Sequence, residues 1–295
     1  MTTAMTSQAQ AGSTLKSRHP VAVLRGLPAS DGAGVKLIRV IGQPRLPDLD
    51  PFLMLDEFGS DKGADYIGGF PDHPHRGFET VTYMLAGRMR HGDNQGNVGL
   101  LRPGSVQWMT AGRGIVHSEM PEQEDGLMQG FQLWVNLPAK DKMCKPRYQD
   151  IDPEKIPVVE RADGVAVKVL AGSFDGVTGP VSAVATEPLY LDIALPAGAA
   201  VDVPVPAEHN AFAYPFEGSA RIGSDTEAKV IARGQIAVLS LGASVHLAAE
   251  SGPARLILVA GRPLREPVAK YGPFVMNTAD EIRQAIADYQ AGRFV

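Results

Sequence analysis

The residues of this chain best suited to chemistry are histidines and carboxylates gathered in one stretch, residues 70–120. Three of the 7 histidines lie at its two ends, His73 and His75 near its start and His117 near its end. A carboxylate accompanies each end, Glu79 after the first pair and Glu119 after the last histidine. Imidazole and carboxylate without cysteine suit iron, manganese, nickel, copper or zinc better than calcium or magnesium. The stretch therefore predicts a transition-metal site.

Strand geometry can bring these residues to one point. Side chains alternate between the two faces of a strand, so the odd-numbered His73, His75 and Glu79 share a face if the strand is regular. His117 and Glu119 share a face by the same parity. Two such strands that face each other across a barrel would present three nitrogens and one or two carboxylates to a single ion. A polar surface loop is the other interpretation, and the second motif, His-x-Glu, favours the metal.

The sequence around these motifs resembles a known family. The likeness is carried by LDPFLMLDEF, DHPHRGFETV, LRPGSVQWMTAGRGIVHSEMP and the C-terminal YGPFVMNTADEIRQAIADYQAGRF. These segments are similar to the pirin family of the cupin superfamily, and the resemblance runs from Val21 to Phe294. It implies an all-β fold of two tandem cupin-type β-barrels, a bicupin, with a C-terminal α-helix. It also implies one divalent transition metal, iron as Fe(2+), in the N-terminal barrel, with the ligands His73, His75, His117 and Glu119.

The chain departs from the general cupin pattern at one position. That pattern has a glutamate ligand four residues after the second histidine, where this chain has Glu79. It also has a histidine ligand three residues after a Pro-Gly pair, and after the pair at 103–104 this chain has Gln107 instead. Pirins share this departure, which weakens Glu79 as a ligand and favours His117 and Glu119.

Composition sets the class of protein. Hydrophobic residues make up 44% and charged residues 21% of the 295 positions, an ordinary globular balance. The net charge of -5 offers no basic footprint for a phosphate backbone, so direct nucleic-acid binding is not expected. No apolar run reaches the roughly 20 residues of a membrane span, and residues 1–18 lack the apolar core of a signal peptide. The single Cys144 cannot form an internal disulfide, which fits a cytoplasmic location.

Short strands between Gly, Pro and Asp turns must position the site. The first clear strand is Val35 to Ile41, and alternation marks others at 80–85 and 131–137. In the strand at 80–85 the odd positions continue the face of Glu79. In the strand at 131–137 apolar and polar side chains alternate, which predicts an apolar face that points into the barrel. That face consists of Phe131, Leu133, Val135 and Leu137.

The second half of the chain repeats the first. Gly218 lies 131 positions after Gly87, in a similar sequence context. On this offset, the counterparts of His73, His75 and Glu79 are a proline, a proline and an asparagine. Only His246 lies near the counterpart of a ligand, His117. One donor is too few to hold a metal, so the second half is not expected to bind one. We therefore expect a disordered tail at 1–18, a metal-binding barrel at 19–140, a connection at 141–157, a barrel without metal at 158–277 and a helix at 278–295.

The predicted C-terminal helix has signals at both ends. Thr278 and Glu281 can form a capping box, in which each side chain accepts a hydrogen bond from the backbone of the other residue. Gly292 can end the helix in a left-handed conformation. An apolar stripe at helical spacing is expected to pack on a barrel. It consists of Ile282, Ile286 and Tyr289.

An open metal site suggests an enzyme. Four protein ligands on an octahedral ion leave two positions for substrate or dioxygen. The resemblance implies a quercetin 2,3-dioxygenase that cleaves flavonols with O2, and Glu119 is the candidate base for the substrate hydroxyl. Candidate cavity walls, each of which can equally be barrel core, are Phe52, Phe70, Phe78, Met84, Trp108 and Met109. Candidates to orient ligands or substrate are Arg76, Glu79 and Gln107.

Two other functions would use the same ligands. Pirins are also known as regulators that bind protein partners without catalysis, with the redox state of the metal tuning the surface. A channel to the metal would indicate an enzyme, whereas an exposed patch that changes with oxidation would indicate a regulator. A third possibility is a metal that only stabilises the barrel. We favour the dioxygenase because open coordination suffices for dioxygen chemistry and no partner motif appears in the sequence.

Overall fold

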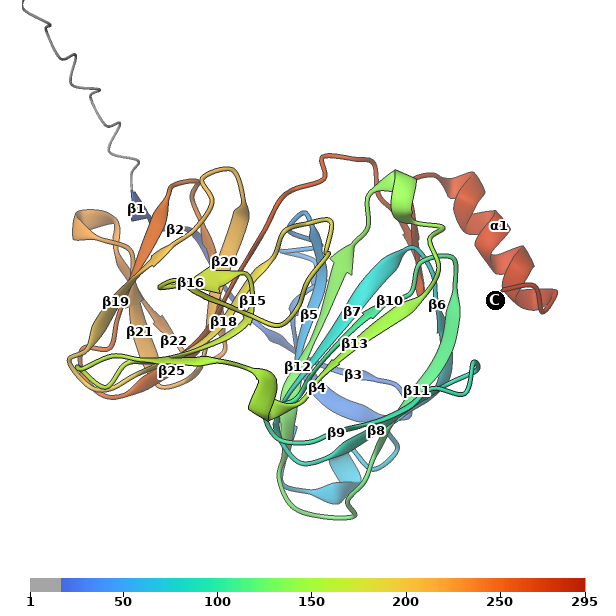
Figure 1. Cartoon of the computed structure of the whole chain (residues 1–295), viewed down its shortest axis with the longest axis horizontal. Helices are drawn as coiled ribbons and strands as arrows, with labels where there is room; N and C mark the ends of the chain where they lie inside the picture. Colours follow the sequence, from blue (N-terminus) through green and yellow to red (C-terminus); the bar gives the residue numbers. More distant parts are fainter. Residues whose placement is uncertain (1–16, 295) are drawn as a thin grey trace, which may run out of the picture.

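The computed structural model describes residues 17–294, which form two β-barrels side by side and one C-terminal helix (Figure 1). This confirms the predicted all-β fold of two tandem barrels with a C-terminal helix. Of the tail predicted at 1–18, residues 1–16 lie outside the described part of the chain. Short 3-10 helices connect some strands, at Gly63–Asp65, Ala139–Asp141, Pro153–Lys155 and Asp225–Glu227.

The first barrel consists of two sheets that face each other. The larger has seven strands in the order β13 (Arg147–Ile151), β10 (Val106–Thr110), β7 (Phe78–Ala86), β12 (Met128–Asn136), β5 (Phe52–Ser60), β4 (Val35–Ile41) and β3 (Leu27–Asp31). The smaller has four strands in the order β6 (Phe70–His75), β11 (Ile115–Pro121), β8 (Met89–Asp93) and β9 (Val98–Leu101). Residues 35–41 thus form the strand that the sequence predicts.

The second barrel has the same two-sheet plan. Its seven-stranded sheet has the order β14 (Val158–Glu160), β15 (Ala166–Ala171), β18 (Leu189–Leu195), β25 (Ala254–Gly261), β20 (Asn210–Glu217), β23 (Gln235–Leu239) and β2 (Pro20–Arg25). Its other sheet has the order β1 (Ser17–Arg18), β24 (Ser244–Ala248), β21 (Ser219–Ile222) and β22 (Lys229–Ala232), with β19 (Ala200–Pro204) also paired to β24. Two small hairpins complete the strands, β16 (Ser173–Phe174) with β17 (Val177–Thr178) and β26 (Ala269–Tyr271) with β27 (Phe274–Met276).

Each end of the described chain packs on the barrel formed mainly by the other half. β1 pairs with β24 and β2 with β23, so residues 17–25 lie in the sheets of the second barrel. The prediction that residues 19–25 belong to the first barrel is therefore wrong, because a pairing partner more than 200 positions away leaves no local signal in the sequence. The buried Arg18 guanidinium donates to the backbone oxygens of Gly242 and His209, at 2.8 and 2.9 Å. The remaining predicted boundaries stay a prediction.

The C-terminal helix, α1 (Ala279–Gln290), begins at the predicted capping box and ends five residues before the predicted position 295. The Glu281 backbone N–H donates to Thr278 Oγ1 at 3.2 Å, and the Thr278 N–H donates to Glu281 Oε2 at 2.8 Å, which completes the capping box. Gly292 adopts a φ of 65°, which closes the helix. Ile282 is buried and Ile286 partly buried in a cluster with Phe274 and Val116, a residue of the first barrel.

The apolar face of β12 is buried, but it does not point into the first barrel. Phe131, Leu133 and Val135 pack in one cluster with residues of the second barrel, including Phe216, whose ring centroid lies 5.3 Å from that of Phe131. The face of β12 that points into the barrel carries polar and amphipathic side chains such as Gln132. The expectation of an inward apolar face was therefore wrong, because the contact between barrels also demands an apolar surface.

Two buried tyrosines join the barrels reciprocally. Tyr83 of the first barrel donates its hydroxyl to Asp192 of the second at 2.5 Å, and Tyr214 of the second donates to Glu57 of the first, also at 2.5 Å. Tyr214 is the counterpart of Tyr83 on the 131-residue offset, so the contact follows the internal repeat. Arg255 also holds Asp192 through two hydrogen bonds, of 2.9 and 2.6 Å.

We expect Tyr214→Phe to lower the free energy of unfolding by about 1.5–3 kcal/mol, the range for a hydrogen bond to a charged group. The effect of Tyr83→Phe should be smaller, because Asp192 keeps two hydrogen bonds from Arg255, whereas Glu57 keeps an ion pair at 3.6 Å with the exposed Arg233. Urea denaturation measures both, and Tyr271→Phe is the matched control because that side chain is 67% exposed. Equal midpoints for the wild type and Tyr214→Phe would show that the hydroxyl does not stabilise the contact.

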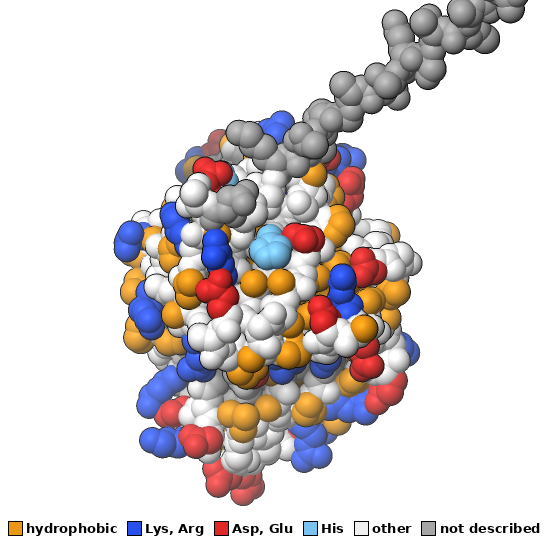
Figure 2. All heavy atoms as spheres, turned by 90° about the vertical axis from the view of Figure 1, so that its left-hand side faces the viewer, with side chains coloured by type: hydrophobic (Ala, Val, Ile, Leu, Met, Phe, Trp, Pro, Cys, Tyr) orange, Lys and Arg blue, Asp and Glu red, His pale blue; other side chains and the backbone are white. Residues whose placement is uncertain are grey.

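The face of the second barrel seen in Figure 2 has no large cluster of side chains of one charge. Acidic and basic side chains are interspersed there with hydrophobic ones. In residues 17–294 no helix is both long enough and apolar enough to cross a membrane.

Candidate metal centre

The three histidines lie together on two neighbouring strands of the smaller sheet. β6 and β11 pair antiparallel, with His117 directly opposite His73 and Ile115 opposite His75. The two strands are therefore adjacent partners in one sheet, and the expectation that they face each other across the barrel was wrong. Adjacent pairing brings the side chains closer, since Cβ atoms of directly opposed residues lie about 4.5–5.5 Å apart.

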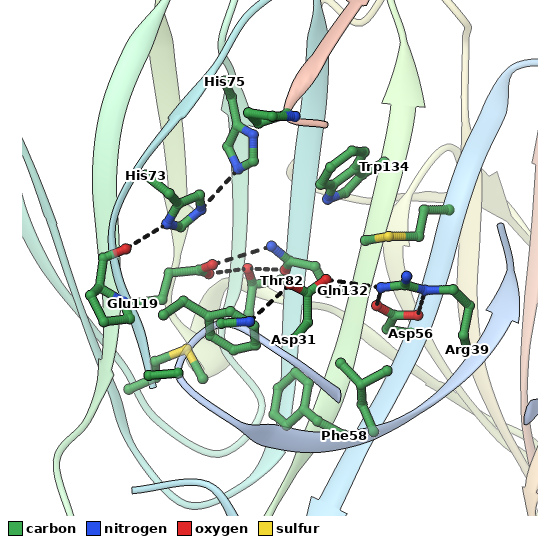
Figure 3. A pocket seen from close by; sticks show the side chains of 18 of the residues that line it. Asp31, Arg39, Asp56, Phe58, His73, His75, Thr82, Glu119, Gln132 and Trp134 are labelled. Carbon is green, nitrogen blue, oxygen red and sulfur yellow. Dashed lines mark hydrogen bonds and ion pairs between the residues drawn. The ribbon is translucent and has the colours of Figure 1, made fainter. Parts of the chain in front are cut away.

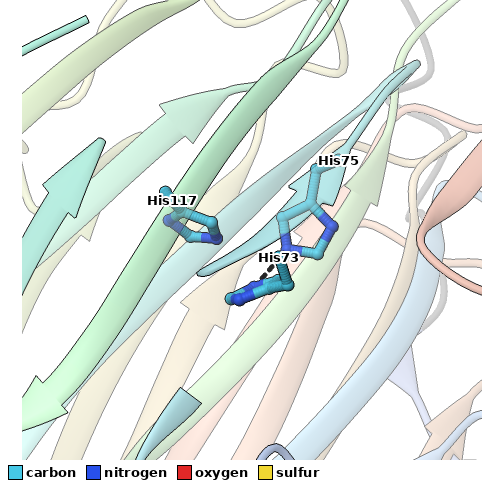
Figure 4. Close-up of side chains that lie close together, drawn as sticks. All are labelled: His73, His75 and His117. Carbon is cyan, nitrogen blue, oxygen red and sulfur yellow. Dashed lines mark hydrogen bonds between the residues drawn. The ribbon is translucent and has the colours of Figure 1, made fainter. Parts of the chain in front are cut away.

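One ring nitrogen of each histidine converges on a common point (Figure 4). These nitrogens of His73, His75 and His117 all lie within 4.8 Å of one another, and the Nε2 atoms of His73 and His75 are 3.0 Å apart. Two ligands at right angles on one ion, each bonded at about 2.1 Å, lie about 3.0 Å apart. The spacing of these two nitrogens therefore fits a shared metal.

Two hydrogen-bonding facts also fit a metal. His73 Nδ1 lies 2.8 Å from the carbonyl oxygen of Pro71, which can only accept, so the proton sits on Nδ1 and Nε2 has a free lone pair. His117 Nε2 is buried and has no hydrogen-bond partner among the described residues. An orphaned buried nitrogen beside two converging ones is the arrangement that a bound cation would satisfy.

Burial keeps two of the imidazoles neutral. It lowers the pKa of His75 and of His117 well below the ordinary 6.5, because an imidazolium would be desolvated and would lie beside other histidines. A neutral imidazole is the form that binds a metal. These two histidines therefore need not lose a proton at neutral pH before they act as ligands.

Glu119 lies near the histidines but outside the three-nitrogen cluster. An irregularity in the pairing of β11 with β6 separates His117 from Glu119 and re-aims the strand between them. The Glu119 carboxylate instead lies 2.9 Å from the hydroxyl of Thr82 and accepts from Gln132 Nε2 at 3.3 Å. Its assignment as the fourth ligand stays a prediction.

Glu79 is not brought to the histidines. It lies on the face of β7 that carries Val81 and Tyr83, where its carboxylate accepts from Thr110 Oγ1 at 2.6 Å and burial raises its pKa. The chain turns at Gly77, with a φ of 87°, between β6 and β7. That turn ends the regular strand, so the shared parity of Glu79 with the histidines does not put it on their side.

Arg76 and Gln107 also point away from the cavity. The Arg76 guanidinium donates to the backbone oxygen of Arg113 and to Asp288 of α1 at 2.8 Å, and it lies 4.4 Å from the centre of the Phe294 ring. Gln107 Nε2 donates to Asp150 at 2.8 Å. Their role in orienting ligands or substrate stays a prediction, and any such effect would act through the backbone or through intermediate residues.

A cavity of about 630 Å³ opens beside the histidines, between the two sheets of the first barrel (Figure 3). His73, His75 and Glu119 line one side. This volume lies in the range of pockets for small organic molecules. Of the candidate wall residues, only Phe70 lines the cavity; the others belong to buried clusters. These are Phe52, Phe78, Met84, Trp108 and Met109.

Most of the cavity wall consists of residues that the sequence motifs do not indicate. Most of the remaining lining comes from the cavity-facing positions of β3, β4, β5, β7 and β12. A signal was present, because Asp56 and Gln132 interrupt long apolar runs in β5 and β12. The missed residues that matter below are Asp31, Arg39, Met54, Asp56, Phe58, Thr82, Gln132 and Trp134.

His91 is a further missed residue of the site. It is buried on β8, and its Nδ1 lies 3.3 Å from Nδ1 of His117. This contact occupies Nδ1 of His117. Nε2, which has no hydrogen-bond partner among the described residues, is therefore the nitrogen left for a ligand. No sequence motif links His91 to the histidine pairs.

The C-terminal segment braces the turn that follows His75. The Arg76 N–H donates to the backbone oxygen of Pro273 at 3.3 Å, and the Val275 N–H donates to that of Arg76 at 3.0 Å. The buried Lys142 Nζ then donates to the backbone oxygens of Gly77 and Val275, at 2.8 and 3.1 Å. The segment thus holds the end of the strand that carries two candidate ligands.

The buried Lys142 should make stability rise with pH above neutrality. Burial lowers its pKa from 10.5 to about 8, so between these values the unfolded chain binds the proton and the folded chain does not. The free energy of unfolding should then rise by up to about 1.4 kcal/mol per pH unit in this window. Urea denaturation from pH 7.5 to 10 should show a steeper rise for the wild type than for Lys142→Met. Lys140→Met, which changes an exposed lysine, is the control, and equal slopes for wild type and Lys142→Met would contradict the prediction.

The fold and the site together define a bicupin, a protein of two cupin-type barrels, with a three-histidine cluster in the first barrel only, among the residues described. The family model described as Pirin matches residues 34–135, and that described as Pirin C-terminal cupin domain matches residues 190–295. The chain belongs to the pirin family.

Relatives of known sequence or structure agree with this assignment. A Pseudomonas aeruginosa protein, named provisionally as a quercetin 2,3-dioxygenase, is 54% identical over 90% of this chain and 94% of its own. A pirin-like protein from Caulobacter vibrioides is 52% identical over 94% of this chain and 99% of its own. A crystal structure of quercetin 2,3-dioxygenase from Acinetobacter baumannii superimposes with a TM-score of 0.86 at 32% identity, over 94% of this chain and 98% of that one.

Proposed function

We propose that this chain is a metal-dependent dioxygenase of pirin type that cleaves flavonols such as quercetin with O2. In this proposal Fe(2+) is bound by His73, His75, His117 and Glu119. The observation that carries it is the convergence of three imidazole nitrogens within 4.8 Å at the side of an open cavity of about 630 Å³. The names of the relatives above support the choice of substrate.

The residues around the cavity have distinct parts in this proposal. Iron(II), when bound, would supply the activation of dioxygen beside the substrate. Glu119 takes the proton of the flavonol hydroxyl that lies nearest the site. Thr82 and Gln132 hold the Glu119 carboxylate toward the cavity through their side chains. Trp134 and Phe58 line the cavity with aromatic surface suited to the flat rings of a flavonol.

An open route to the proposed metal favours an enzyme over a regulator that binds protein partners. A regulator needs no route for a small molecule, whereas the cavity reaches His73, His75 and Glu119 directly. We also propose a cytoplasmic location, on the basis of the single Cys144.

The test is anaerobic reconstitution with iron(II), followed by oxygen uptake with quercetin. We expect one iron per chain and uptake that depends on both iron and flavonol. Parallel samples with nickel(II), manganese(II) and zinc(II) identify the metal that supports turnover. Iron binding without turnover of any flavonol would contradict the enzymatic function. If chelator then lowers the melting temperature strongly, the metal has a stabilising role instead.

A further inference from the structure

The side of the cavity away from the histidines carries an arginine fixed by two aspartates (Figure 3). Arg39 Nε and Nη2 donate to the two oxygens of Asp56 at 3.0 and 2.8 Å, and Nη2 also donates to Asp31 at 2.9 Å. The Asp56 side chain is only 3% exposed, whereas that of Asp31 is 51% exposed. Asp56 therefore positions the guanidinium, and Asp31 lies where a ligand can reach it.

This group has hydrogen-bonding capacity that the described residues do not use. Nη1 of Arg39 donates no hydrogen bond to any residue of the described chain, so its two N–H groups are available. Asp31 accepts from Arg39 and from the Gly32 N–H, and a carboxylate has about four acceptor positions. The three side chains together carry a net charge of -1, which comes from one guanidinium and two carboxylates.

The chemistry of the group selects one kind of ligand. A hydroxyl can accept from Arg39 Nη1 and donate to Asp31 at the same time, and two adjacent hydroxyls on one ring can do both with better geometry. A carboxylate can only accept, and here it would lie beside two like charges. An unsubstituted ring would leave the guanidinium N–H groups desolvated and unpaired, which is costly.

Because Arg39 lies across the cavity from the histidines, it faces the part of a ligand farthest from the metal. We propose that Arg39 and Asp31, held by Asp56, recognise hydroxyl groups on the ring of the substrate remote from the metal. The site thereby selects uncharged, polyhydroxylated flavonols over unsubstituted or carboxylated ones. This inference rests on the proposed flavonol function, because the ligand must span the cavity from the histidines to Arg39.

The test compares three ligands that share one metal-binding group. Quercetin carries hydroxyls on both outer rings, 3-hydroxyflavone carries none there, and 3-hydroxyflavone-4′-carboxylic acid carries a charge. Isothermal titration calorimetry on the iron-loaded protein under anaerobic conditions measures binding without turnover. For the wild type we expect quercetin to bind at least tenfold more tightly than 3-hydroxyflavone, and the carboxylic acid to bind most weakly.

Asp31→Asn is the decisive variant because it removes one charge from a half-exposed position and leaves the buried Arg39–Asp56 pair intact. We expect the preference for quercetin over 3-hydroxyflavone to fall to threefold or less, with the affinity for 3-hydroxyflavone unchanged. The carboxylic acid should gain about tenfold. Asp175→Asn, the same change beside Arg161 in the second barrel, is the control and should leave all three affinities as in the wild type.

The outcomes separate this inference from the function on which it rests. Tight binding of all three ligands without discrimination, or an unchanged preference in Asp31→Asn, would overturn the recognition role and leave the flavonol function standing. If none of the three ligands bound the iron-loaded protein, both would be overturned.

Discussion

His75→Ala is expected to lose both the metal and the oxygen uptake with quercetin. His75 is 3% exposed, and its Nε2 lies 3.0 Å from that of His73, so its removal leaves a buried gap in the nitrogen cluster. Changes in residues that merely support a ligand typically cost 10–100-fold in metal affinity or activity, so loss of a ligand should cost at least about 100-fold in each. Elemental analysis after anaerobic reconstitution measures the iron, and an oxygen electrode measures the uptake.

The matched control is His246→Ala in the second barrel. His246 pairs with Asp202 at 2.9 Å and is no part of the proposed site, so this variant should keep full iron and full uptake. Uptake that persisted in His75→Ala would remove the whole site hypothesis. Loss of iron in both variants would mean that the fold, and not the site, had been damaged.

Glu119→Gln should separate proton transfer from metal binding. Glutamine can keep the contact with Thr82 Oγ1 but cannot take a proton from the substrate. General-base catalysis contributes typically about 10²–10⁴-fold, so turnover should fall by that factor. Glutamine keeps an amide oxygen at the position of the carboxylate, and the three imidazole nitrogens remain, so iron content should stay within about threefold of the wild type under saturating iron.

Iron content and oxygen uptake are also measured for Glu119→Gln. Full iron with full turnover would show that Glu119 is not the base. Parallel loss of iron and turnover would show that Glu119 acts mainly as a ligand, and the base would then have to be sought elsewhere in the cavity. Gln129→Glu, outside the cavity on the same strand as Gln132, is a control for the change of charge.

Local patterns in the sequence were enough to predict much of the fold and the cluster of histidines. The strand at 35–41, the capping box of α1 and the left-handed Gly292 depend on neighbouring residues, and each is found where expected. The convergence of His73, His75 and His117 follows from strand alternation once two strands pair. The internal repeat also holds, since Gly87 and Gly218 both adopt positive φ angles, of 80° and 65°.

Nonlocal contacts account for what the sequence could not predict. Strand alternation predicts that Glu79 lies on the same face as His73 and His75. The turn at Gly77 ends that strand, so the alternation does not continue to Glu79. The apolar face of β12 looked like barrel core because contact with a second barrel requires the same hydrophobic pattern as an interior. Arg39 and Asp56 could not be linked to the histidines, because they lie on strands of the opposite sheet and share no motif with them.

The exchange of chain ends between the barrels constrains how the protein can be made. On the ribosome, β2 has no partner until β23 (Gln235–Leu239) is synthesised, and the turn after His75 lacks its brace until Phe274–Met276 has emerged. The first barrel therefore lacks this brace while its own half is translated, and the second barrel needs strands from both ends of the chain. We therefore expect that separately expressed halves fail to fold alone but recover metal binding when they are refolded together.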